Sequence, residues 1–272
     1  MEKNLEEMLL WIDRVEIDSL AIMQRTIKND DELRSSGAFS SAANNPCRGA
    51  YDMMLLAQAR WILQSDLNAA RDLLGKIPLM GALSVRAFQE MNLAYNKNGL
   101  WDKSSFEYFP FVPLLIGLLL ADAKQEFEAL CNEITICATF DQHSRKHIAG
   151  EFAFQIANIG AGRTTLISKE AFENTQAFKS SHFIYGYHEM LYHIAQHNAD
   201  DFEKIRAERE AEFPKRSRSR VALGQLDNWG MGKIAQSVTF DALGTALCRL
   251  ALWRGMEVNV DTRLYPEEFY AI

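Results

Sequence analysis

The chain has 272 residues, of which 48% are hydrophobic, and its formal net charge is −7. This length and composition suffice to bury a substantial core, so we predict a soluble globular protein. The acidic charge argues against direct nucleic-acid binding or an anionic membrane as the main partner, because phosphate binding is driven by clustered Lys and Arg. A basic protein partner is compatible with this charge.

Helical periodicity runs through almost the whole sequence and predicts an all-α protein. We expect a first helix over residues 4–34 and, after a small polar loop, a second over 46–64 with Pro46 as its first residue. Asp66 is then placed to cap a third helix.

Gly75, Pro78 and Gly81 interrupt the pattern, so the fourth helix is expected to begin near Leu83 and to end near Tyr95. The apolar run 109–121 is too short to cross a bilayer and predicts a short buried helix. Further helices are expected over 122–138, 144–159, 183–197 and 199–213. The helix over 144–159 is expected to end at Gly160-Ala-Gly162, with an αL glycine as its C-cap.

The C-terminal part predicts a long core helix over 234–253, because apolar residues surround nearly its whole circumference, followed by a short strand over 256–261. Its polar line contains Ser237, Asp241, Thr245 and Arg249. A carboxylate in the middle of such a helix costs several kcal/mol unless it is paired, so we expect Asp241 to be a buried structural residue.

Three kinds of partner are considered for Asp241: the neighbourhood of Arg249, an arginine of another helix such as Arg60 or Arg86, and backbone amides.

Taken together, the expected elements predict a compact multi-helix bundle with a buried C-terminal helix and at most one short strand. We expect one helical domain over 1–272, with subdomains over 1–100 and 101–272 as an alternative, because no long polar linker divides the chain.

The location of the protein is predicted from its first residues and its cysteines. The sequence MEKNLEEMLLW carries acids where a secretion signal carries lysines. The cysteines lack CxxC spacing, and most lie in apolar helical patterns: Cys47, Cys131, Cys137 and Cys248. A reducing cytoplasm fits both observations.

Two histidine stripes have the i, i+4, i+8 spacing that places metal ligands on one helical face: His143, His147 and Glu151, and Glu189, His193 and His197. The first is expected to face solvent and the second to flank a core face, and neither matches a known motif of helical metal sites. We therefore predict no metal and no cofactor.

Two loop motifs are also interpreted structurally. The segment 227–234 approaches a phosphate loop but lacks its first glycine and its Ser/Thr, and no strand precedes it. The run PKRSRSR, 214–220, follows an acidic helix and lacks aromatic residues that stack on bases, so a solvated loop is favoured over a partner contact.

Two segments carry a resemblance to a known family. They are HFIYGYHEMLYHIAQHNADDFEKIRAEREAEF at 182–213 and VTFDALGTALCRLALWRGMEVNVDTRLYPEEF at 238–269. Their pattern resembles the end of the all-helical immunity protein 49-like family of bacterial polymorphic toxin systems. A second toxin-immunity family, paired with nuclease toxins, has a similar helical C-terminal half.

The resemblance implies a non-enzymatic cytoplasmic protein that binds and neutralises a cognate toxin domain, often a nuclease or deaminase. A net-acidic inhibitor associates quickly with a basic toxin. The acidic helix then supplies the candidate partner-binding residues: Asp200, Asp201, Glu203, Glu208 and Glu212. Two alternatives stay open, namely a helical scaffold or adaptor, and a metal-dependent helical enzyme that uses Glu189, His193 and His197.

Overall fold

Regular secondary structure is helical wherever the structure describes the chain. The computed structural model describes residues 2–98, 111–136, 148–167, 187–216, 241–262 and 264–270. The helices are α1 (Glu2–Ser35), α2 (Phe39–Gln64), α3 (Leu67–Leu74), α4 (Ile77–Asn98), α5 (Phe111–Leu120), α6 (Lys124–Ile136), α8 (Ile148–Gly160), α10 (Tyr187–Ala195), α11 (Ala199–Arg216) and α14 (Ala242–Trp253), with 3-10 turns η2 (Thr164–Leu166) and η3 (Glu267–Phe269). Within these ranges no strand forms, and the all-α prediction is confirmed.

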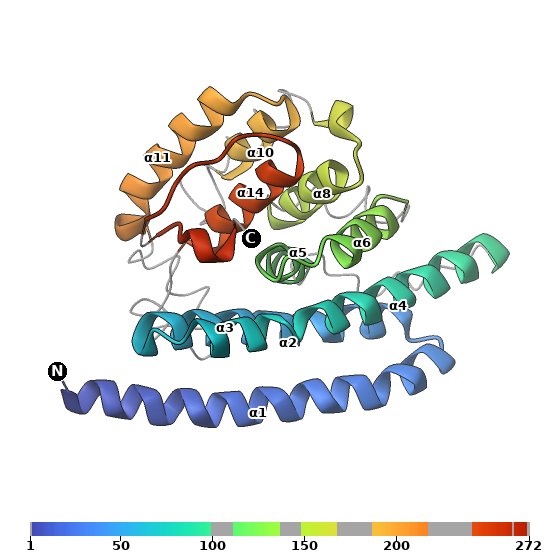
Figure 1. Ribbon diagram of the computed structural model, residues 1–272. Helices are drawn as coiled ribbons and strands as arrows, with labels where there is room; N and C mark the ends of the chain where they lie inside the picture. The colour runs from blue at the N-terminus through green and yellow to red at the C-terminus, as the bar shows by residue number, and fades with distance from the viewer. Residues whose placement is uncertain are drawn as a thin grey trace.

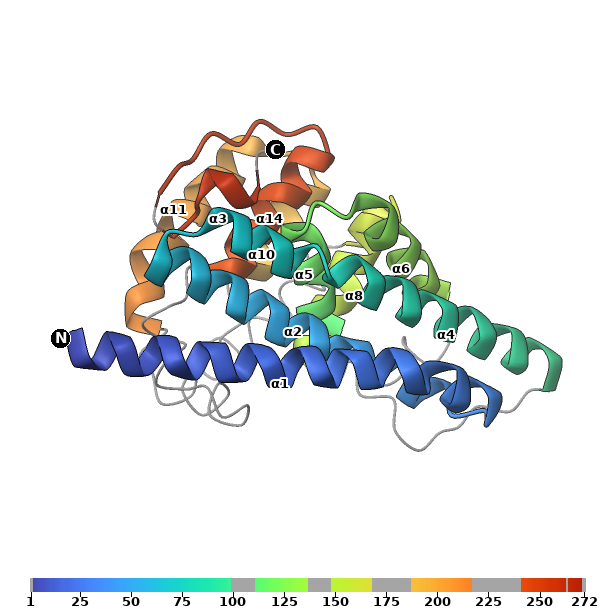
Figure 2. The same cartoon turned by 60° about the horizontal axis from the view of Figure 1, so that its bottom comes forward.

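Helices α1 to α4 form one side of the molecule. The long α1 lies along α2, and α2 packs against α3 and α4, with α1 on the outer edge (Figures 1 and 2). Helix α2 begins at Phe39, so the prediction that it starts at Pro46 is wrong. The preceding Ala42 and Ala43 are buried, and the Ser84 hydroxyl of α4 donates to the Ala43 carbonyl at 2.8 Å. The stabilisation from packing on α4 therefore outweighs the loss of the helical hydrogen bond that the N–H of residue 46 would otherwise donate.

Helix α4 begins at Ile77, earlier than the glycines and the proline suggested. Pro78 lies in the first turn of α4, where a backbone N–H has no helical acceptor, so proline costs no hydrogen bond there. Gly81 is buried, and a Cβ there would lie 2.9 Å from Cδ2 of Leu118 in α5. In the same crossing a Cβ on Gly117 of α5 would lie 2.9 Å from Cδ1 of Ile77. These glycines allow the two helices to approach closely rather than breaking them.

Helix α5 is the centre of the fold, which confirms the prediction of a short buried helix. All of its residues except Pro113 are buried. It contacts α2, α3 and α4 on one side and α6, α8 and α14 on the other (Figure 1). One hydrophobic cluster joins Ile12 of α1 to Tyr270 near the C-terminus. The division of the chain into domains stays a prediction.

The predicted buried C-terminal helix is confirmed as α14, whose residues 244–251 are all buried. It is described from Ala242 onward, and the predicted helical segment 234–240 lies outside the described residues. The predicted strand over 256–261 does not form; the segment is irregular and ends in one isolated bridge between Thr262 and Tyr265. The alternating Met256 and Val260 are buried in the core without a neighbouring strand to pair with.

Two helix ends follow the local signals, and a third does not. The Asp66 carboxylate accepts a hydrogen bond from the Ala69 amide at 2.9 Å, and Gly162 has φ +74°, so the predicted cap and αL glycine are confirmed. Helix α11 continues through Pro214 to Arg216, beyond its predicted end at Phe213. None of the described helices combines the length and apolarity that crossing a membrane requires.

Candidate functional site

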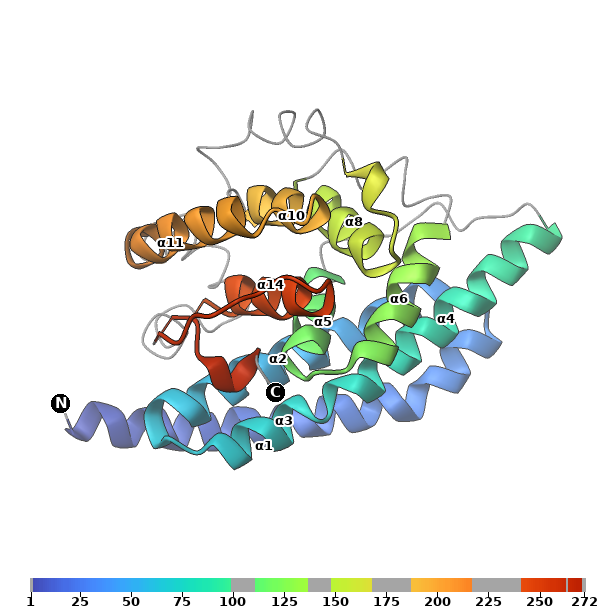
Figure 3. The ribbon, with the colours of Figure 1, turned by 45° about the horizontal axis from the view of Figure 1, so that its top comes forward.

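Helix α11 lies at the edge of the molecule opposite α1 (Figures 1 and 3), and it exposes acidic side chains to solvent. Four of the five predicted partner-binding residues are exposed there: Asp200, Asp201, Glu203 and Glu208. The fifth, Glu212, belongs to α11, but its side chain lies outside the described residues. Lys204 and two small residues, Ala207 and Ala211, share this surface. We call the exposed carboxylates of 200–208 the acidic face.

Two arginines of α11 point inward. Arg206 and Arg209 are only 5% and 8% exposed, although they alternate in sequence with glutamates. With a helical period of 3.6 residues, they fall on the same side as the buried Phe202 and Ile205. Over residues 200–210, the helix therefore exposes four carboxylates and one cation, Lys204, and buries its two arginines.

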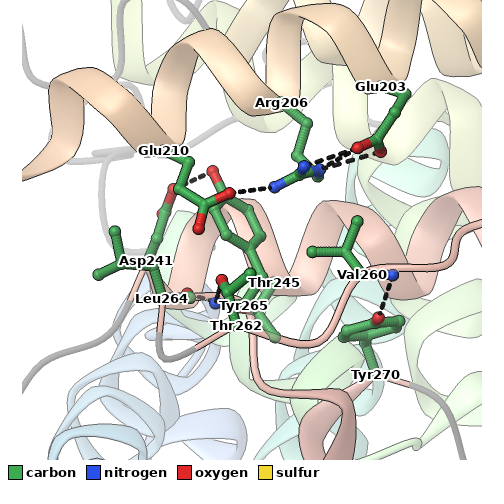
Figure 4. Close-up of polar contacts among 10 residues, drawn as sticks. All are labelled: Glu203, Arg206, Glu210, Asp241, Thr245, Val260, Thr262, Leu264, Tyr265 and Tyr270. Atoms are coloured by element: carbon green, nitrogen blue, oxygen red, sulfur yellow. Dashed lines mark hydrogen bonds and ion pairs between the residues drawn. The ribbon is translucent and has the colours of Figure 1, made fainter.

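Arg206 anchors α11 to the core beneath it (Figure 4). Its guanidinium donates to Glu203 at 2.6 Å and to Glu210 at 2.8 Å, and its Cζ lies 4.9 Å from the centre of the Tyr265 ring. Burial lowers the pKa of Arg206, but the hydrogen bonds to Glu203 and Glu210 raise it more, so the net shift is upward. Arg206 stays charged, and its cation–π contact holds α11 against the C-terminal segment.

Asp241 lies directly under this contact, with 1% of its surface exposed. It is the N-cap of α14: Oδ1 accepts from the Gly244 amide at 2.8 Å and from the Tyr187 hydroxyl at 2.9 Å. Oδ2 accepts from the Tyr265 hydroxyl at 2.6 Å. Burial raises the pKa of Asp241 to about 6, against the lowering effect of the Tyr265, Gly244 and Tyr187 hydrogen bonds. We call Asp241, Tyr187, Tyr265 and Gly244 the Asp241 cluster.

Gly244 has a steric role in the Asp241 cluster. A Cβ at this position would lie 2.5 Å from Oδ2 of Asp241 and 2.5 Å from Cε1 of Tyr265. Glycine is thus the residue that lets the tyrosine reach the carboxylate at the start of α14. The cluster links α10, α14 and the segment after α14, and through Arg206 it fixes the position of the acidic face.

The sequence interpretation of Asp241 requires two corrections. Asp241 precedes the helix as its cap instead of lying within it, because its carboxylate binds the free amide of the first turn. Of the proposed partners, the backbone amide of Gly244 is present, and the charge of Arg209, an arginine of α11, also acts on Asp241. The two arginines named in the prediction lie elsewhere, since Arg60 pairs with Asp13 and Glu16 and Arg86 lies 4.0 Å from Asp31. The tyrosine partners were missed.

Arg249, near the other end of α14, is also buried, at 1% exposure, but it has a different partner from Asp241. Its Nη1 donates to Asp122 at 2.6 Å, and Asp122 lies in the turn after α5 with φ +55°. Burial lowers the pKa of Arg249. The carboxylate of Asp122 acts to raise this pKa, and the positive charge of Arg71 acts to lower it further. This ion pair ties the end of α5 to α14 at a site separate from the acidic face.

A second buried polar group joins α8 to α10. Gln155 donates to Glu151 at 3.1 Å, and its side-chain oxygen lies 3.2 Å from Nδ1 of His188, which is 1% exposed. Because the amide nitrogen of Gln155 is directed at a carboxylate, its oxygen accepts and Nδ1 of His188 carries the hydrogen. Glu151 is 6% exposed, so its predicted solvent-facing position is wrong; residues 151–159 of α8 are buried on nearly every side.

The histidine stripes do not gather into a metal site in the part of the chain that is described. His143 and His147 lie outside it. In the other stripe α10 ends at Ala195, and His197 follows in a turn with φ +53°, so the three residues do not share one helical face. No group of three His, Cys, Asp or Glu suited to a metal occurs among the described residues.

Several other predictions fall partly or wholly outside the described residues. The phosphate-loop-like segment 227–234, the basic residues 217–220 and Cys137 are not described. The other three cysteines, Cys47, Cys131 and Cys248, are buried free thiols.

Comparisons of the chain with models of known protein families, with curated proteins and with solved structures give no match.

Proposed function

We propose that this chain is a cytoplasmic immunity protein that binds and neutralises a cognate toxin domain of basic character, with the acidic face of α11 as its contact surface. The observation that carries the proposal is the separation of charge on α11. The helix exposes Asp200, Asp201, Glu203 and Glu208 while it buries Arg206 and Arg209.

This separation of charge on α11 is significant because burying a charged side chain costs free energy. A buried guanidinium requires compensation, and Arg206 obtains it from Glu203, Glu210 and the ring of Tyr265. The acids at the outer edge, Asp200 and Glu208, form no ion pair with a described residue. Their charge is therefore available to a partner, and complementary charge chiefly raises the association rate and the specificity.

The Asp241 cluster supports the same function through rigidity. Binding costs less when the contact surface is already ordered, because fewer side chains lose freedom on association. The acidic face rests on Arg206, whose contact with Tyr265 continues to the Asp241 carboxylate. The resemblance of segments 182–213 and 238–269 to immunity proteins concerns these same elements.

Co-expression tests the proposal. The C-terminal region of the product of the adjacent gene is expressed alone and together with this chain, and growth is scored before the complex is purified. Toxicity that this chain relieves through a stable complex is the expected result. A harmless neighbouring product would contradict the immunity function, and binding without relief of toxicity would favour a scaffold or adaptor instead.

A further inference from the structure

A polar groove lies between α1 and α2, on the side of the molecule away from the acidic face. These two helices run side by side (Figure 2), and the groove encloses about 320 Å³. Its lining residues are Ile22, Arg25, Thr26 and Asn29 from α1 and Asn44, Asn45 and Arg48 from α2. The lining thus contains two guanidinium groups, three amides and one hydroxyl, with no carboxylate among them.

The two arginines of the groove differ from the buried or bridging arginines of the chain. Arg34, Arg60 and Arg206 each pair with at least two carboxylates. By contrast, neither Arg25 nor Arg48 forms an ion pair with a described residue. The one side-chain hydrogen bond of Arg25 within the described chain is a 3.4 Å contact from Nε to the Ala21 carbonyl of its own helix.

Arg48 does act electrostatically on the carboxylate of Asp52, one turn further along α2. Asp52 feels the charge of Arg48 and also accepts a hydrogen bond from Ser19 at 3.4 Å, away from the groove lining. The guanidinium groups of Arg25 and Arg48 thus come from different helices, line one groove and retain most of their hydrogen-bond donors. Two such groups suit an anion with several acceptor oxygens.

The amides of the groove add acceptors and further donors. The side-chain oxygen of Asn44 is buried and accepts no hydrogen bond. An unmet buried acceptor costs free energy, and a ligand hydroxyl or N–H would remove that cost. Asn29 and Asn45 present the same amide chemistry. The groove therefore matches a ligand with an anionic end and a polar body that can donate.

We propose that the α1–α2 groove binds a small phosphate monoester with a polar body, such as a sugar phosphate or a nucleoside monophosphate. Arg25 and Arg48 hold the phosphate from both walls, and the three asparagines contact the body. The volume of about 320 Å³ lies at the small end of ligand sites, which are roughly 300 to 1,000 Å³, and so favours a ligand of this size. This site is independent of the acidic face.

Titration calorimetry on the full chain tests the site with glucose 6-phosphate, adenosine monophosphate, inorganic phosphate and the unphosphorylated parents. We expect saturable binding of at least one ester, tighter than inorganic phosphate and absent for its parent. Arg25→Gln and Arg48→Gln should each weaken binding about tenfold or more, since charged hydrogen bonds are lost. Asn44→Ala should weaken the ester more than inorganic phosphate.

Arg14→Gln is the matched control, because Arg14 is an exposed arginine of α1 with the same change of charge. It precedes Arg25 by about 16 Å along the helix, at 1.5 Å per residue. We expect its affinity to stay within twofold of the unmodified chain. If either glutamine variant fails to fold, Arg25→Lys replaces it in the test. This variant keeps the positive charge but loses the bidentate hydrogen bonding of a guanidinium, so it should still weaken binding of the ester.

Any of four results would overturn the site. The first is that neither ester binds saturably at millimolar concentration, and the second is that inorganic phosphate binds as tightly as the esters. The third is that Arg14→Gln loses as much affinity as Arg25→Gln. The fourth is that a polyglutamate peptide binds more tightly than either ester. The last would make the groove a docking site for an acidic protein segment.

Discussion

Asp241 shows how one buried carboxylate connects the core to the surface. Its oxygens accept from a backbone amide and two tyrosine hydroxyls, and Tyr265 in turn lies against Arg206 of α11. A hydrogen bond to a charged group contributes roughly 1.5–3 kcal/mol, which is more than a neutral one contributes, while burial of the charge opposes this stabilisation. In Asp241 burial is the larger effect on the pKa.

The raised pKa of Asp241 gives the protein a specific pH dependence. The folded-state pKa of about 6 lies above the ordinary 3.8, so the folded state holds this proton more tightly than the unfolded state does. The contribution of the group is full below about pH 4 and is lost as the pH rises through 6. We expect the unfolding free energy of the wild type, relative to Asp241→Asn, to fall by on the order of 3 kcal/mol from pH 4 to pH 7.

Urea unfolding of both proteins at four pH values measures this change. Asp200→Asn serves as the control, because it removes an exposed carboxylate of the same type. A difference between wild type and Asp241→Asn that stays constant with pH would contradict the account of a carboxylate whose burial dominates.

The sequence indicated that Asp241 needs partners, but it did not identify them. The expectation of a long helix from 234 placed Asp241 within a helical turn, in one polar line with Arg249. The actual partners, Tyr187 and Tyr265, are 54 and 24 residues away in the sequence, and only the packing of α10 and the last segment onto α14 brings them together. Local periodicity carries no information about such pairs.

At the scale of helices, glycines decide how closely elements approach. Gly160 at the end of α8 packs on α6, and a Cβ there would lie 2.5 Å from Sγ of Cys131 and 2.7 Å from Cε1 of Phe127. By contrast, a Cβ on Gly49 of α2 would meet only Met80, with its Sδ at 3.4 Å. The two glycines thus differ in surroundings while both lie in helices.

We expect Gly160→Ala to destabilise the protein by about 1–3 kcal/mol, because a methyl group is forced into a packed contact between helices. Gly49→Ala should be neutral or stabilise by up to about 1 kcal/mol through helix propensity. Thermal or urea unfolding distinguishes the two. Equal effects of both substitutions would contradict the close α6–α8 contact.

The helices themselves were largely predictable, because amphipathic periodicity and capping residues are local signals. Asp66 and Gly162 mark their helix ends as expected. The error at Pro78 arises because this residue lies in the first turn of α4, where no helical hydrogen bond is lost. The errors at Pro46 and Gly81 have another cause, since each residue discourages helix in isolation but is tolerated here by burial against a neighbouring helix. Tertiary packing overrides local preference at these points.

Across the whole molecule, α5 separates two surfaces with different chemistry. One side carries α1 and α2 with the polar groove, and the other carries α11 with the acidic face (Figure 1). The sequence allowed the acidic face to be predicted because its charges cluster in one helix. It did not indicate the groove, because residues 22–29 and 44–48 meet only after α1 folds back along α2.

The acidic face is the central claim, and its test needs two variants of equal charge. Asp200→Lys with Glu208→Lys reverses two exposed acids of α11, whereas Asp201 and Glu203 are kept because they bond to Asn198 and Arg206. Asp18→Lys with Glu32→Lys reverses two exposed acids of α1. Both variants change the formal net charge from −7 by the same amount.

The decisive measurement is the association rate constant of each variant with the purified toxin domain at low and high salt. We expect the α11 variant to associate about tenfold or more slowly than the unmodified chain at low salt, and we expect high salt to reduce this difference in rate. The association rate of the α1 variant should stay near that of the unmodified chain. An equal fall for both variants would mean that net charge alone governs the encounter, and no fall for either would contradict the acidic face as the contact surface.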